Sequence, residues 1–127
     1  MPKYTYSDIE AFLNEINKTM RFNACMIVDS KGFVIAANSE GEYDSTKIAA
    51  LGSAIYSSLT LILKEVNIEN LKFVRIDYDS NSIILKSFKV KDEEFILVVL
   101  TEDLSKIEEK ISKISELLAD MLSHIVI

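Results

Sequence analysis

An uncharged run in the middle of the chain constrains its fold more than any other feature. Residues 48–63 read IAALGSAIYSSLTLIL, without a charge, although 27% of the whole sequence is charged. Large apolar residues recur here at the three- and four-residue spacing of a helix face packed on its own domain, at Ile48, Leu51, Ile55, Leu59, Ile62 and Val66. We therefore expect this apolar face to pack on the chain's own core.

The rest of this helix is small and weakly polar, where an ordinary surface helix would carry Lys and Glu. Its residues are Ala49, Ala50, Gly52, Ser53, Ala54, Tyr56, Ser57, Ser58 and Thr60. We expect this second face to be a contact surface for a partner subunit. One alternative is a helix that its own domain encloses completely, because helices without a polar face also occur in cores.

A membrane-spanning helix is the other alternative for this run. Such a helix needs about 20 predominantly apolar residues. The run is shorter, is interrupted by Ser, Thr and Gly, and lies between Asp44 and Lys47 on one side and Lys64 and Glu65 on the other. We therefore expect no direct insertion into a membrane.

Size and composition predict a single cytoplasmic domain over residues 1–127. The chain has the usual length of one domain, and its three Gly and one Pro leave no room for a flexible linker. The N-terminus passes into an amphipathic pattern without the features of a signal peptide. The net charge of −6, with lysines scattered among carboxylates, argues against nucleic-acid binding, which requires clustered Lys and Arg.

Apolar periodicity predicts the order α-β-β-α-β-β-β-α, an α+β fold with a five-stranded antiparallel sheet and helices on both faces. A capping box at residues 7–10 opens a first helix that ends near Met20. A hairpin follows, with strands at 24–28 and 33–37, and then the uncharged helix, capped by Asp44 or Ser45. Three strands at 71–78, 83–90 and 94–100 form a meander, and residues 95–100 are apolar throughout, as expected of a central strand.

A last helix is predicted to open at Glu102 or Asp103. Its apolar residues stand at heptad spacing, namely Leu104, Ile107, Ile111, Ile114, Leu118, Met121 and Ile125. The seam barely reaches the three to four heptads of a persuasive coiled coil. We expect it to pack on the sheet, with residues 122–127 extending towards a partner.

The sequence lacks the residue combinations of an active site or a metal site. A Cys–His or Ser–His pair would need the only histidine, His124, and nothing orients it. The only cysteine, Cys25, lies in an apolar run and is expected to be a buried structural thiol. One Cys and one His cannot build a structural zinc centre. The remaining carboxylates are at strand ends and turns, where they usually stay solvated: Asp77, Asp79, Asp92, Glu93 and Glu94.

Residues 41–47, GEYDSTK, superficially resemble a phosphate-binding loop. Such a loop needs a second glycine and a Lys that precedes the hydroxyl residues. Here the second glycine is missing, Lys47 comes after Ser45 and Thr46, and Glu42 and Asp44 would repel phosphate. We therefore expect no enzyme activity, no cofactor and no GTP binding by the isolated chain.

Several segments, taken in order, match one family pattern. They are ACMIVD at 24–29, SKG at 30–32, FVIAA at 33–37, the long small-residue helix from Ile48, KFVRI at 72–76, IIL at 83–85 and FILVVL at 95–100. Over nearly the whole chain, this series resembles the Roadblock domain, the family of dynein light chains and prokaryotic GTPase regulators.

The resemblance implies a sandwich of the profilin and longin type and a noncatalytic protein. It implies a homodimer or heterodimer built by the middle helix and the third strand, with the matching surface at Ala49, Gly52, Ser53, Tyr56, Thr60, Phe73 and Arg75. It also implies a Ras-like small GTPase as partner, for which the chain would be an adaptor or an activator. A small-ligand sensor of related shape and a purely structural dimer are the alternatives.

Overall fold

The computed structural model of the chain describes residues 3–38 and 43–125, which form eight elements in the predicted order. These are α1 (Tyr6–Thr19), β1 (Phe22–Asp29), β2 (Val34–Ala37), α2 (Ser45–Glu65), β3 (Val74–Tyr78), β4 (Asn81–Val90), β5 (Glu93–Thr101) and α3 (Ile107–Ser123). The predicted α+β fold class is confirmed.

The strands form one antiparallel sheet in the order β2-β1-β5-β4-β3. β5 lies at its centre between β1 and β4, as its apolar sequence predicts, and seven successive residues from Phe95 to Thr101 are buried. The short strand β2 and the strand β3 form the two edges. The predicted hairpin and meander are therefore both confirmed.

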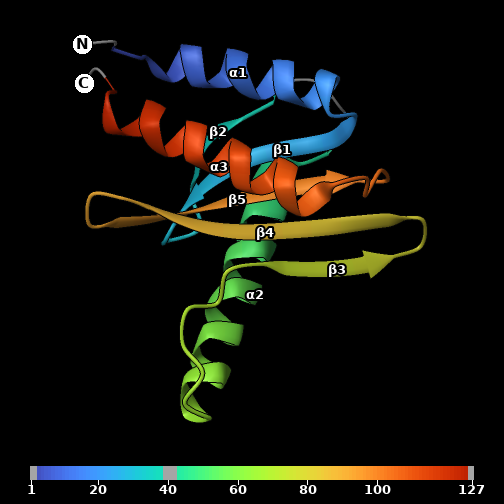
Figure 1. Cartoon of the computed structure of the whole chain (residues 1–127), viewed down its shortest axis with the longest axis vertical. Coiled ribbons are helices and arrows are strands. Elements are labelled where there is room, and N and C mark those ends of the chain that lie inside the picture. The colour runs from blue at the N-terminus through green and yellow to red at the C-terminus, as the bar shows by residue number, and fades with distance from the viewer. Residues whose placement is uncertain (1–2, 39–42, 126–127) are drawn as a thin grey trace.

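Helices cover both faces of the sheet (Figure 1). α1 and α3 lie on one face, where their apolar side chains join Ile27, Ile84 and Leu97 in the larger core. α2 lies on the other face, over a smaller core that includes Met26, Leu85 and Val98. Apolar residues alternate between these cores along β1, β4 and β5, as the pleat of a sheet requires.

α1 begins earlier than its sequence pattern indicates. Its N-cap is Thr5, whose side chain accepts a hydrogen bond from the Asp8 backbone N–H, while the Asp8 side chain accepts one from the Thr5 N–H. The capping box therefore uses Thr5 and Asp8 in place of Ser7 and Glu10. Aspartate can close the box because its carboxylate reaches the N-cap N–H over the same three-residue span.

α3 begins later than predicted, at Ile107 in place of Glu102 or Asp103. The Asp103 carboxylate accepts a hydrogen bond from the Ser105 backbone N–H, and the Asp103 backbone N–H donates to Thr101 Oγ1. Lys106 then has a left-handed φ of 50° immediately before the helix. These local turns exclude Leu104 from the helix. The buried residues of α3 pack on the sheet, as predicted.

Two predicted features fall partly outside the described residues. Gly41 and Glu42 of the loop before α2 lie outside them, as do residues 126–127 of the C-terminal segment. Asp44, at the described end of the loop, is the N-cap of α2 and accepts hydrogen bonds from the Thr46 and Lys47 backbone N–H groups. At the end of α3, Ile125 forms a β-bridge with Tyr4.

Candidate dimerisation surface

α2 buries mainly small side chains against the sheet, while Ile48 and Ile55 of its large apolar series pack partly on the same core. Its buried residues are Ala49, Gly52, Ser53 and Tyr56. A Cβ atom added at Gly52 would lie 3.2 Å from both Leu85 Cδ2 and Val98 Cγ2, so the helix backbone rests on side chains of β4 and β5. The expected allocation of the two helix faces is therefore wrong, because these small residues permit a close approach within one chain.

Tyr56 fastens the middle of α2 to the sheet. Its hydroxyl forms hydrogen bonds with the Leu71 carbonyl oxygen at 3.1 Å and with Ser87 Oγ at 2.7 Å. It thereby joins α2 to β4 and to the segment between α2 and β3. It is the last buried residue of the helix, so the sheet supports α2 only as far as this point.

The large apolar residues of α2 form a second face, which we call the aliphatic stripe. Ile48, Ile55 and Leu59 are half-buried, whereas Leu51, Ile62 and Val66 are 51%, 60% and 60% exposed. The exposed Leu61 and Ile68 lie close by in the sequence. An exposed series of large aliphatic side chains along one helix face is typical of a protein–protein contact.

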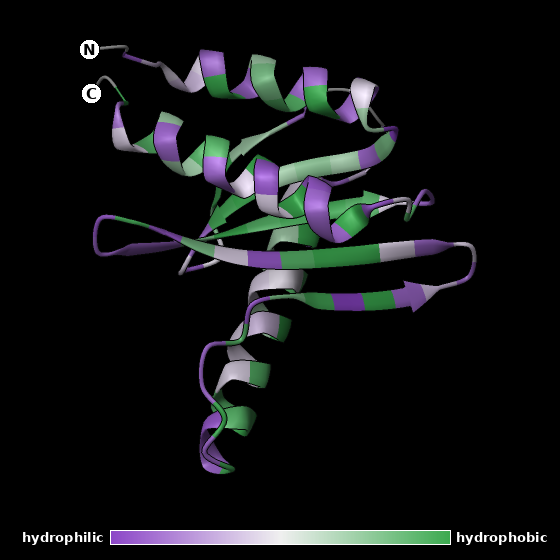
Figure 2. Cartoon of the chain, viewed as in Figure 1, coloured by the Kyte–Doolittle hydropathy of each residue, from purple (hydrophilic) through white to green (hydrophobic). Residues whose placement is uncertain are grey.

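The second half of α2 projects beyond the sheet. Figure 1 shows α2 passing behind β4 and β3 and continuing past the β3 edge. Figure 2 shows apolar segments along this projecting half, with polar ones at its end. No residue of α2 after Tyr56 is buried. Within the described part of the chain, the segment after α2 runs back beside this half, and Ile62 and Val66 of the aliphatic stripe stay exposed.

By length and composition alone, α2 is also a candidate membrane span. Of its most apolar 18-residue stretch, 22% is buried in the protein. Its first half is held on the sheet by Ala49, Gly52, Ser53 and Tyr56. Only residues 57–65 are free of the sheet, and they span about 14 Å at 1.5 Å per residue. The hydrocarbon core of a bilayer is about 30 Å thick, so the free segment is too short to cross it.

β3 is an edge strand next to this projecting helix. Its pairing places Val74 opposite Leu85 and Ile76 opposite Ile83, on the α2 face of the sheet. Among the described strands, β3 pairs with β4 alone. An edge strand whose other side is unpaired can add a further strand from another molecule.

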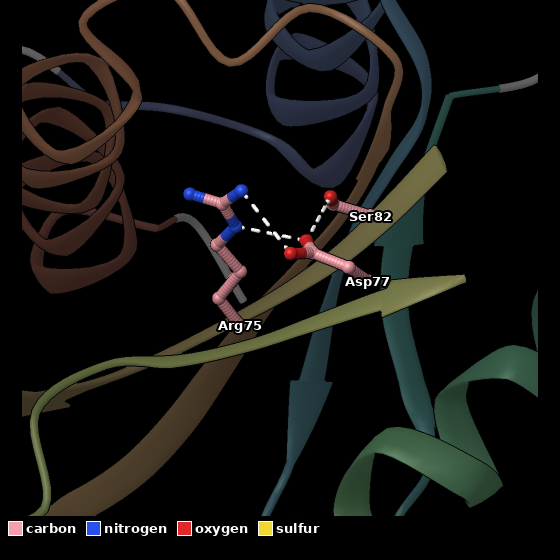
Figure 3. A network of polar contacts seen from close by, with 3 residues as sticks. All are labelled: Arg75, Asp77 and Ser82. Carbon is pink, nitrogen blue, oxygen red and sulfur yellow. Dashed lines mark hydrogen bonds and ion pairs between the residues drawn. The ribbon is translucent and has the colours of Figure 1, made fainter. Parts of the chain in front are cut away.

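Arg75 and Asp77 lie on the opposite face of β3 (Figure 3). Arg75 Nε donates to Asp77 Oδ1 at 2.8 Å, and Arg75 Nη2 donates to Asp77 Oδ2 at 3.2 Å. The Ser82 hydroxyl donates to the same carboxylate. The hydrogen bonds from Arg75, and to a smaller extent that from Ser82, lower the pKa of Asp77. Both charged side chains remain accessible, at 43% and 60% exposure.

The other residues that the resemblance assigns to a dimer surface have different surroundings. Thr60 is exposed, and its hydroxyl donates to the Tyr56 carbonyl oxygen at 2.9 Å. It lines a hollow of about 230 Å³ between the end of α2 and the following segment, together with Leu63 and Leu71. Phe73 is half-buried against the core under α1 and α3. The seven assigned residues therefore do not form one surface.

Other hollows lie at the two ends of β5. One of about 460 Å³ is lined by Arg21, Asn23, Glu102 and Asp103. Another of about 330 Å³ has a mixed lining that includes Ile35, Phe95 and Lys91. Between the helices and the sheet, the space is occupied by the two apolar cores. Among the described residues, no group of His, Cys, Asp and Glu side chains could hold a metal ion.

Cys25 and His124 each interact locally. The Cys25 thiol donates to the Leu13 carbonyl oxygen at 3.3 Å, and burial raises its pKa to about 12. It is therefore a buried, protonated thiol, as the sequence indicates. The His124 ring lies at the end of α3, with Nδ1 2.9 Å from the Asp120 carbonyl oxygen and 3.0 Å from Ser123 Oγ.

Comparison with known proteins identifies related sequences and folds. The sequence profile of the Roadblock/LC7 domain matches residues 8–101. The uncharacterized protein MJ0310 of Methanocaldococcus jannaschii is 31% identical over 94 residues, which are 74% of this chain and 79% of that protein.

Two solved structures share the fold at low sequence identity. Myxococcus xanthus MglB has a TM-score of 0.78 and 18% identity, with 96% of this chain and 92% of MglB covered. A Roadblock/LC7 domain from Streptomyces avermitilis has a TM-score of 0.67 and 15% identity, with coverages of 80% and 85%.

Proposed function

Because this chain belongs to the Roadblock/LC7 domain family, we propose that it is a cytoplasmic, dimeric adaptor or regulator of a Ras-like small GTPase. It contributes protein surface and no catalytic residue. The observation that carries the dimer is the projecting, aliphatic half of α2 beside the unpaired edge of β3. The GTPase is supported by family membership.

Symmetric pairing of two β3 strands would cover both of these features at once. A two-fold axis perpendicular to the sheet makes the two strands antiparallel and places both α2 helices on the same face of a joined sheet. Each projecting half then lies over the partner's sheet, beside the partner's α2. The aliphatic stripes are removed from water, and the two free β3 edges disappear, while the short β2 strands remain the edges of the joined sheet.

The interface therefore uses the aliphatic stripe, which is the face of α2 next to its buried small residues. Leu51, Ile62 and Val66 are its most exposed large residues on the aliphatic stripe. Fully burying a side chain of this size stabilises a protein by about 1.5–3 kcal/mol. A charge placed among these residues would have to be buried without a partner, which is far more costly than the loss of apolar contact alone.

A single pair of variants tests the dimer. Ile62→Asp should convert the protein to a monomer, whereas Ser57→Asp, an exposed substitution on the other side of α2, should leave the dimer intact. Sedimentation of both variants and of the wild type measures the mass directly. A wild-type protein that sediments as a monomer at high concentration would contradict the proposal.

The action on a GTPase is proposed to be positional. An arginine finger accelerates hydrolysis by about 10³–10⁵-fold in some GTPase systems. Here Arg75 is paired with Asp77, and Arg21 lines a hollow with Glu102 and Asp103. Neither arginine is presented as a free finger. The dimer would therefore orient the catalytic and switch residues of the GTPase itself.

Screening the small GTPases of the source organism in both nucleotide states tests this part. We expect one of them to bind the dimer, and we expect calorimetry to detect no GTP binding by the isolated chain. Arg21→Ala should leave any activation unchanged. Loss of activation in that variant, with the dimer intact, would refute the positional mechanism, and the absence of any GTPase partner would leave only a structural dimer.

A further inference from the structure

The edge strand β3 carries opposite charges at two positions of one face. Arg75 and Asp77 are separated by one residue, Ile76, whose side chain lies on the other face. Both charged groups are exposed. The order along the edge is therefore positive, then negative, with an apolar residue between them.

In a dimer with a two-fold axis, this order of charges makes one strand register more favourable than its neighbours. If the axis passes through Ile76, that residue faces its own copy, and the residues on either side exchange partners. Arg75 then stands opposite the partner's Asp77, and Asp77 stands opposite the partner's Arg75. Val74 stands opposite the partner's Tyr78 on the α2 face.

The adjacent symmetric registers bring like charges together. An axis through Arg75 would place two guanidinium groups opposite each other, and an axis through Asp77 would place two carboxylates opposite each other. Opposite charges facing each other across two strands are stabilising, and like charges are destabilising. An axis between residues is excluded, because it would put α2 of the two protomers on different faces of the sheet.

We propose that Arg75 and Asp77 select the register of the β3–β3 pairing between two copies of this chain, through two reciprocal ion pairs about Ile76. This inference rests on the dimer of the proposed function. The pair observed within one strand is exchanged for pairs between strands, so no charge loses its partner. Ser82 continues to hold the Asp77 carboxylate through its hydroxyl.

Complementary charge reversal tests the inference. Arg75→Glu places a negative charge opposite the partner's Asp77, and Asp77→Lys places a positive charge opposite the partner's Arg75. Each variant alone should dimerise at least roughly tenfold more weakly than the wild type. Mixed in equal amounts, the two should form a heterodimer. The glutamate at position 75 of one chain then faces the lysine at position 77 of the other, and the remaining Asp77 faces the remaining Arg75. Lys113→Glu, an exposed reversal on α3, should have no effect.

A second measurement locates the axis independently. Directly opposed strand residues have Cα atoms about 4.5–5.5 Å apart, within the range of about 4.4–6.8 Å that a disulfide requires. Ile76→Cys should therefore form a covalent dimer on mild oxidation, whereas Val74→Cys should not. The natural Cys25, 1% exposed, is common to both variants, so the difference reports the register.

The results separate this inference from the proposed function. A wild type that is monomeric would overturn the dimer itself. A dimeric wild type whose charge variants still dimerise normally, or fail to recover on mixing, would overturn only the register. If the wild type is monomeric but forms a stable complex with a different chain through β3, the occupant is that chain and the homodimer is refuted.

Discussion

Gly52 determines how closely α2 approaches the sheet. The Cβ atom of any other residue at this position would lie 3.2 Å from methyl groups of Leu85 and Val98. These methyl groups, or the helix, would have to move to accommodate it. Neighbouring contacts at Ala49 and Ser53 are also made by small residues. The separation of helix and sheet is therefore a property of individual side-chain sizes at three positions.

Substitution of Gly52 by leucine should destabilise the protomer. The added side chain overfills a packed layer, which typically costs about 1–3 kcal/mol, more than the gain of about 1 kcal/mol in helix propensity. Urea denaturation measures the loss. Ala50→Leu, an exposed substitution on the same helix, should change stability by less than about 0.5 kcal/mol. Equal stabilities of the two variants would show that the layer can expand.

Cys25 should make stability depend on alkaline pH. Its pKa is raised by burial to about 12, from an ordinary value of 9.0. The unfolded thiol therefore ionises first, so the contribution of this group is fully present below pH 9 and is lost as pH rises towards 12.

The difference in urea midpoint between wild type and Cys25→Ala should accordingly narrow as pH rises from neutral to about 11. Val99→Ala is the matched control, because Val99 is buried opposite Cys25 and does not titrate. Its difference from wild type should stay constant. A Cys25→Ala difference that is equally constant would mean that the folded thiol ionises as easily as the unfolded one.

At the scale of elements, α2 consists of two halves with different supports. Residues 45–56 include every buried residue of the helix, whereas residues 57–65 include none. In the proposed dimer, the second half is covered by the partner. Its backbone hydrogen bonds should open more readily when that cover is lost, because local stability follows local burial.

Amide hydrogen exchange of Ile62→Asp should show this division. Residues 57–65 should exchange faster than in the wild type, while residues 45–56 retain their protection. Ser57→Asp should exchange like the wild type throughout, apart from amides next to the substitution. Uniform exchange along α2 in both proteins would show that the second half is stable without a partner.

The sequence predicted the elements well because apolar periodicity depends on burial against one layer. Eight elements, the sheet and its central strand follow from such patterns. The buried face of α2 could not be predicted in this way, because two sides of the helix carry no charge. The larger size of the aliphatic residues led to the wrong face being assigned to the core. The signal that distinguishes them is a glycine with small residues at helical spacing, Ala49, Gly52 and Ser53, which permits close packing.

The start of α3 could not be predicted for a different reason. Glu102 and Asp103 are good helix-opening residues, but the Asp103 carboxylate accepts a hydrogen bond from the Ser105 N–H, and Lys106 adopts a left-handed φ. Such turns depend on local hydrogen bonds that compete with helix formation. The proposed role of Arg75 and Asp77 could not be predicted from the sequence either. It depends on β3 being an edge strand and on both side chains lying on the same face of that strand.

For the molecule as a whole, folding and association should be linked. A dimer that buries the aliphatic stripe stabilises the folded protomer by mass action. The midpoint of thermal unfolding should therefore rise with chain concentration over a roughly hundredfold range. Ile62→Asp should unfold at a lower temperature that does not depend on concentration. A wild-type midpoint that is independent of concentration would contradict this linkage.

The reciprocal pairing of Arg75 and Asp77 across the two-fold axis also has a consequence for how such a dimer can evolve. One substitution in the gene alters both halves of the interface at once, so a single charge reversal creates two repulsive contacts. After gene duplication, a reversal of Arg75 in one copy and of Asp77 in the other would suppress both self-pairings and favour the mixed pair. A symmetric dimer can thus become a dedicated pair of different subunits through one substitution in each copy.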